Sequence, residues 1–121
     1  MGRVGLLLGT ILLLAGCEQP VLAPDEQGIC WRMIERPGRE PDFRPMANNV
    51  PNIESCAARV EALRLIQGEA ASGAYQGRFI FATDAELSVA TSYEGKAYRL
   101  FRPEERRRIA DGVQVLVREA R

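Results

Sequence analysis

The residue types in this chain restrict the chemistry that it could perform. The 121-residue sequence contains no histidine. Nucleophilic catalysis by a Ser–His or Cys–His pair needs an imidazole base, so neither is available. The sequence also has no Gly-rich phosphate loop and no calcium-binding loop, and it lacks the commonest nitrogen ligand of transition metals. It therefore predicts no metal site, no cofactor and no nucleophilic catalytic centre.

Carboxylate chemistry is the enzymatic alternative that survives this test. Cleavage of a glycosidic bond needs only one or two acidic side chains in a cleft. The residues to consider are Glu69, Asp84 and Glu86. No motif distinguishes them from turn and surface residues, so solvation is the simpler interpretation. A cell-wall hydrolase is thus the least supported reading.

The strongest local feature is a basic segment at residues 96–108. It carries six positive side chains against Glu104 and Glu105, a local net charge of +4. The six are Lys96, Arg99, Arg102, Arg106, Arg107 and Arg108. Such a surface suits anionic lipid headgroups, cell-wall polymer or an acidic face of a partner protein. The alternative is a solvated helix face on which Glu104 pairs with Arg107 and Arg108.

The charge of the whole chain gives no attraction for nucleic acid. Basic and acidic residues balance at 16 each. A nucleic-acid-binding domain usually carries a clear excess of positive charge. We therefore expect no nucleic-acid partner.

The first of the three cysteines follows an export signal. Arg3 gives a positive start, and the run 4–15 is uncharged and apolar. This run is too short to cross a bilayer, which takes about 20 apolar residues, and it is typical of a secretory signal. It leads into the motif Leu14-Ala15-Gly16-Cys17.

This motif resembles the lipobox of bacterial lipoproteins. The resemblance implies that residues 1–16 are removed, that the Cys17 sulfur receives a diacylglyceryl group, and that the new amine is acylated. Two or three acyl chains give stable anchoring. The protein is then expected on the periplasmic face of the cell envelope. In the enteric-type sorting rule an Asp after the lipidated cysteine retains the protein on the inner membrane, so Glu18 favours the outer membrane.

Lipidation of Cys17 leaves Cys30 and Cys56 as a pair. In an oxidising periplasm they are expected to form a disulfide. The chain-entropy model gives this cross-link about 3.5 kcal/mol of stabilisation. The alternative is two buried free thiols. Without a histidine base or a Cys-x-x-Cys motif, the pair is structural.

The elements that position these residues begin after a tether. In residues 17–28, Pro20, Pro24 and Gly28 break regular structure and there is no apolar period. We therefore expect a tether there and one periplasmic domain at 29–121. The apolar run 29–34 predicts a strand, with Trp31 packed in the core against the disulfide. Four prolines exclude a helix or a central strand at 37–52. We expect a long ordered loop there, either a binding loop or a plain connection.

A helix is expected at 53–67, with Asn52 as its N-cap and Gly68 just beyond its C-terminus. Its apolar face is formed by Ile53, Cys56, Val60, Leu63 and Ile66. The residues expected away from that face are Glu54, Arg59, Glu61 and Arg64. Because Cys56 belongs to the apolar face, the disulfide would fix the helix to the strand that contains Trp31.

The second half of the chain predicts a meander and a helix. Runs at 75–82, 87–93 and 97–101 predict three antiparallel strands, with Gly77 at a bulge. Their aromatic residues are expected mostly in the core. Pro103 opens a second helix. Its apolar stripe is Ile109, Val113, Leu116, Val117 and Ala120.

The expected fold class is α+β. A small antiparallel sheet, made of the three-stranded meander and an N-terminal strand, carries two helices on one face and leaves the other face partly open. These features predict a non-enzymatic envelope lipoprotein that acts by protein interaction, as an accessory subunit or assembly factor of an envelope complex. The alternative is a small binding or inhibitor protein for cell-wall material or a wall enzyme.

Overall fold

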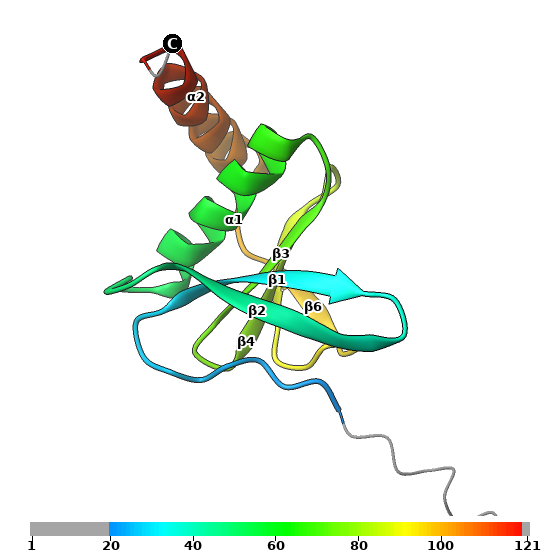
Figure 1. Ribbon diagram of the computed structural model, residues 1–121. Helices are drawn as coiled ribbons and strands as arrows, with labels where there is room; N and C mark the ends of the chain where they lie inside the picture. Colours follow the sequence, from blue (N-terminus) through cyan, green and yellow to red (C-terminus); the bar gives the residue numbers. More distant parts are fainter. Residues whose placement is uncertain (1–19, 120–121) are drawn as a thin grey trace, which may run out of the picture.

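The computed structural model describes residues 20–119 as an α+β domain (Figure 1). The motif Leu14-Ala15-Gly16-Cys17 and Ala120 lie outside the described residues. The elements in chain order are β1 (Cys30–Arg36), β2 (Arg39–Ala47), α1 (Ile53–Gln67), β3 (Ala71–Tyr75), β4 (Arg78–Ala82), β5 (Leu87–Ala90), β6 (Ala97–Arg99) and α2 (Pro103–Glu119). The α+β class is confirmed.

The sheet is larger than the sequence predicts. It has six antiparallel strands in the order β2-β1-β3-β4-β5-β6, in place of a three-stranded meander with one extra strand. The two unexpected strands are β2 and β3. The run expected as one strand at 75–82 contains the end of β3, a turn and β4. Gly77, with φ of +83°, lies in that turn and not at a bulge.

The segment 37–52 is not the long loop that its prolines predicted. Arg39–Ala47 pairs with β1, with Phe43 opposite Met33. Because β2 forms one edge of the sheet, no strand lies beyond it that would need hydrogen bonds from residues 41 and 45. Pro41 and Pro45, which lack an N–H group, are therefore tolerated there. A proline-rich stretch thus forms an edge strand, although it could not form a central one.

The second unexpected strand, β3, consists of small residues because α1 packs closely on it. A Cβ atom placed on Gly73 would lie 2.6 Å from Cγ2 of Val60 and 2.5 Å from the carbonyl oxygen of Trp31. Only glycine fits at this point of the sheet. The sequence of β3 reflects this close approach and does not show the β-branched residues that favour a strand.

Helix α1 is confirmed with the expected ends. The side chain of Asn52 accepts a hydrogen bond from the N–H of Ser55 at 2.9 Å, and Gly68 has φ of +78°. Cys56 and Val60 are fully buried. The apolar face is rotated from the prediction, since Ile66 is 68% exposed whereas Glu61 is 1% exposed.

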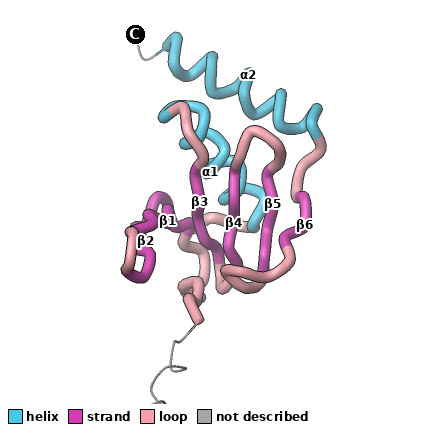
Figure 2. The backbone as a smooth tube through the Cα atoms, turned by 90° about the vertical axis from the view of Figure 1, so that its right-hand side faces the viewer, coloured by secondary structure: helices cyan, strands magenta, loops and turns pink. Residues whose placement is uncertain are grey.

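Helix α2 packs against α1, and not on the sheet as expected. Figure 2 shows it lying across the end of the domain, above the turn that joins β4 to β5. Only α1 covers the sheet, through its contacts with β3 and β4. Val113 of the expected apolar stripe is buried and Ile109 is half-buried.

The disulfide between Cys30 and Cys56 is confirmed. It joins β1 to α1, with the two Cα atoms 5.3 Å apart, and both residues are fully buried. Trp31 does not pack against it as expected, because successive strand residues point to opposite faces. Among residues 20–119, the indole N–H of Trp31 is a buried donor without a hydrogen-bond partner.

The face of the sheet away from α1 carries an aromatic cluster. Strands β2 and β4 are separated by two others, which in a flat sheet places them about 14 Å apart. The ring centroids of Phe43 and Phe79 are nevertheless 6.5 Å apart, so the sheet curls. Figure 1 shows the β1–β2 hairpin crossing β3 and β4 at a steep angle. The ring centroid of Tyr93 lies 5.6 Å from that of Phe79, and Tyr93 helps to cover this face.

Candidate interaction surface

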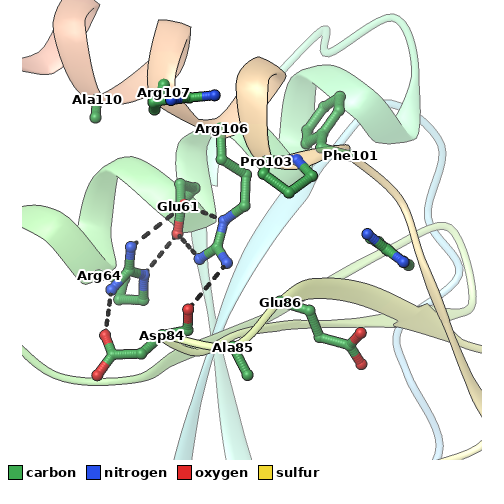
Figure 3. A pocket seen from close by; sticks show the side chains of 11 residues that line it. Glu61, Arg64, Asp84, Ala85, Glu86, Phe101, Pro103, Arg106, Arg107 and Ala110 are labelled. Carbon is green, nitrogen blue, oxygen red and sulfur yellow. Dashed lines mark hydrogen bonds and ion pairs between the residues drawn. The ribbon is translucent and has the colours of Figure 1, made fainter.

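A buried carboxylate joins the two helices. The Glu61 side chain, on α1, binds the guanidinium of Arg106, on α2, with contacts of 2.6 and 3.0 Å. It also accepts a hydrogen bond at 2.6 Å from Nε of Arg64, one turn along α1. Both guanidiniums also reach the β4–β5 turn, Arg64 at the Asp84 carboxylate and Arg106 at the Thr83 carbonyl. Figure 3 shows the arginines meeting at Glu61. These contacts hold α2 against α1 and the turn.

The surroundings of Glu61 keep it ionised. Burial favours the neutral acid, but hydrogen bonds and charge from Arg106 and Arg64 outweigh burial and lower the pKa of Glu61 below its ordinary value of 4.5. Each carboxylate oxygen is already bound to a guanidinium. Glu61 is therefore a structural anion and a poor proton donor at neutral pH.

The N-terminus of α2 is capped from within the helix. The Glu105 side chain accepts a hydrogen bond from the backbone N–H of Arg102 at 3.0 Å, one half of a capping box. This backbone hydrogen bond and the Arg102 guanidinium lower the pKa of Glu105. The Arg102 side chain has no hydrogen-bond acceptor and is a poor cap. The Glu105 carboxylate supplies the acceptor at this end of the helix.

The six basic residues predicted as one surface have separate roles. Arg106 is half-buried and belongs to the ion-pair network, and Arg102 pairs with Glu105 at 3.2 Å. The Lys96 ammonium lies 5.6 Å from the centroid of the Tyr98 ring. Arg99, Arg107 and Arg108 are exposed. Of the six, the accessible positive charges are at residues 96–102 and at Arg107 and Arg108 of α2, and Arg106 does not belong to this set.

A hollow of about 290 Å³ lies where these elements meet. Arg99 and Phe101 line it from the chain that leads to α2, and Arg107 lines it from the helix. Asp84 and Glu86 contribute acidic side chains from the β4–β5 turn, where Glu86 lies on the side away from Glu61 (Figure 3). The lining of the hollow thus combines charged side chains with the apolar side chains of Phe101, Pro103 and Ala110.

The three acidic residues considered for wall hydrolysis are not brought together. Asp84 and Glu86 border the hollow, and the Asp84 side chain is fully exposed and paired with Arg64. Glu69 lines a different depression, beside the end of α1. The buried carboxylate at this place, Glu61, was assigned to the solvent side of the helix in the sequence. The one feature of the sequence that indicates the Glu61 ion pair is its spacing of three residues from Arg64 on the helix.

The N-terminal segment is fixed to the domain from Pro24 onward. The Pro24 carbonyl accepts a hydrogen bond from Gly77, and the Gly28 carbonyl accepts one from Val50, both at 2.8 Å. In Figures 1 and 2 this segment lies at the lower end of the domain and α2 at the upper end. The described chain therefore begins at the pole opposite α2.

The described residues lack two other kinds of feature. Among residues 20–119, no helix has the length and apolar character that a membrane crossing requires. In the same range, no cluster of cysteine or carboxylate side chains is arranged to hold a metal ion. No protein-family model, curated protein or solved structure matches the chain.

Proposed function

We propose that this protein is an envelope lipoprotein that is anchored through lipid on Cys17 and acts by binding a partner protein of an envelope complex. Residues 1–16 are the export signal in this proposal. Glu18 directs the mature protein to the outer membrane, on its periplasmic side. The disulfide of the domain is consistent with an oxidising compartment.

The observation that carries the proposal is the polarity of the domain. The chain begins at one pole, and α2 with its exposed arginines occupies the other. Within residues 20–119, Pro24 is the first residue with a backbone hydrogen bond to the domain. The seven residues 17–23 would span roughly 20 Å if extended. An anchor at Cys17 places α2 on the side away from the membrane. The basic surface then meets a partner in the periplasm and not the headgroups of the anchoring bilayer.

The chemistry of the domain also favours binding over catalysis. The carboxylate most shielded from water, Glu61, is neutralised by two arginines and lies inside the network that joins the helices. The remaining charged groups at this pole lie on an open surface, which suits recognition of a complementary charged face.

Affinity purification from detergent-solubilised membranes tests the proposal. The unaltered protein should recover a defined partner, and the Arg107→Ser, Arg108→Ser double variant should recover less of it. The matched control is Arg39→Ser, Arg59→Ser, which removes the same charge from exposed residues of β2 and α1. Recovery of no partner under mild conditions contradicts the proposal. Partner-independent binding to purified cell-wall sacculi, lost in the double variant, would favour the alternative of a wall-binding protein.

A further inference from the structure

The two edges of the sheet differ in their ability to accept another strand. At the β2 edge, Pro41 and Pro45 lack the N–H groups that a further strand would need. At the other edge, β6 contains no proline and all of its residues are exposed. Within residues 20–119 no strand lies beyond β6. The β6 edge is therefore the one that is open to pairing.

The backbone of β6 presents hydrogen-bonding groups on its open side. The N–H of Leu100 donates to the carbonyl of Leu87 at 2.8 Å, toward β5. The direction of backbone groups alternates along an antiparallel strand. The N–H and C=O groups of Ala97 and Arg99 consequently point away from β5. A partner strand would find two donors and two acceptors at this edge.

The side chains around this edge select for an acidic partner. Tyr98 is 63% exposed and has Lys96 over its ring. Arg99 and Arg107 line the adjoining hollow, in which Asp84 and Glu86 are opposing charges. Positive residues outnumber acidic ones here, and pairing with a second copy of this edge would bring like charges together.

We propose that β6 accepts an extended acidic segment of a partner protein as a seventh strand. The main chain of the segment pairs with Ala97 and Arg99, and its alternate carboxylates lie on the face of the sheet that carries Arg99 and Arg107. In such strand addition, backbone hydrogen bonds supply affinity and the flanking side chains supply specificity. The inference rests on the proposed function, because the partner is the one that the anchored protein is proposed to bind.

A defined peptide tests the mode of binding. The ¹⁵N-labelled Cys17→Ser protein is titrated with acetyl-Thr-Glu-Val-Glu-Val-Glu-Thr-amide and followed by NMR. The amides of Ala97 and Arg99 should shift most and exchange more slowly with solvent. The same peptide with lysine in place of glutamate should not bind. Equal binding of both peptides, or shifts centred away from β6, would overturn the proposal.

Two substitutions separate the contribution of backbone hydrogen bonds to peptide binding from the contribution of charge. Ala97→Pro removes an outward N–H without changing charge or the bonds to β5, and it should weaken peptide binding about tenfold. Arg99→Gln retains the N–H and should weaken binding about threefold, while Arg39→Gln on β2 should leave it unchanged. Should Ala97→Pro disturb the fold, the exchange rates of the Ala97 and Arg99 amides in the peptide-bound domain decide in its place. Unchanged affinity in a folded variant overturns strand addition.

The natural partner distinguishes this inference from the proposed function. If Ala97→Pro recovers the same partner from membranes as the unaltered protein, strand addition is wrong and the proposed function stands. If the unaltered protein recovers no partner, the proposed function itself is contradicted. Loss of the partner in Ala97→Pro, with membrane attachment retained, supports both.

Discussion

At the scale of single residues, Glu61 determines how the helices meet. Its carboxylate is 1% exposed and binds two guanidiniums from different helices. A buried ion pair contributes little compared with a well-packed apolar core, but removal of one charge leaves the others unpaired and is costly. The effect of a substitution here is therefore larger than the net contribution of the network.

Glu61→Gln should lower the free energy of unfolding by about 3 kcal/mol, because Arg64 and Arg106 lose their buried counter-charge. Urea denaturation of the Cys17→Ser protein measures this difference. Glu54→Gln, an exposed substitution in the first turn of the same helix, is the control and should change stability by less than about 0.5 kcal/mol. Equal stability of the two variants would show that the ion-pair network is unimportant.

The same residue gives stability a dependence on pH. Because the pKa of Glu61 is lower in the folded protein than its ordinary value of 4.5, its contribution is complete above that value. The contribution is lost as the pH falls through the folded-state pKa. The stability gap between the unaltered protein and Glu61→Gln should thus be largest at neutral pH and shrink under acid. A gap that stays constant down to pH 3 would contradict this.

At the scale of elements, close packing of α1 on β3 determines which residues the sheet contains. Gly73 lies between Val60 of the helix and the backbone of β1, with no room for a Cβ atom. On α2, by contrast, a Cβ atom at Gly112 would have no neighbour within 4 Å. Replacement of the two glycines by alanine should therefore change the free energy of unfolding in opposite directions.

Gly73→Ala should destabilise the protein by about 1–3 kcal/mol, because the added methyl group would displace Val60 or the β1 backbone. Gly112→Ala should stabilise it by about 0.5–1 kcal/mol through helix propensity. Thermal unfolding of both variants checks the pair. A stable Gly73→Ala protein would mean that α1 packs less closely on the sheet than described.

Elements with local signals could be predicted from the sequence, and those that depend on tertiary packing could not. Helix α1 has an N-cap at Asn52 and a glycine at its end, and both were correctly assigned. Strand β3 lacks β-branched residues because of its contact with α1, and β2 contains prolines because it is an edge. Neither reason is visible before the sheet order is known.

For the candidate site, too, the local feature was predictable from the sequence and the long-range contact was not. The sequence indicates the basic segment, but the ion pair that draws Arg106 inward depends on Glu61, 45 residues earlier in the chain. No local pattern relates two residues so far apart. The prediction of one surface from all six basic residues rested on their closeness in the sequence. In the fold, tertiary contacts give these residues different partners.

At the scale of the whole molecule, the N-terminal segment and the exposed arginines of α2 lie at opposite ends of the domain. The docked segment that starts at Pro24 fixes where the chain enters the domain, and the disulfide and the Glu61 network fix α1 and α2 above it. In the proposed account, lipid at Cys17 turns this polarity into an orientation relative to the membrane. The proposed interaction at the far pole depends on that anchor.

Mass spectrometry of the purified protein, with membrane fractionation of the Cys17→Ser variant, tests the anchor most directly. The account predicts a mature chain that begins at Cys17 and carries diacylglyceryl and acyl groups. It also predicts that Cys17→Ser is released from membranes with its fold and its Cys30–Cys56 disulfide intact. A mature chain without lipid at Cys17, or a Cys17→Ser protein that stays membrane-bound after removal of the signal, would contradict it.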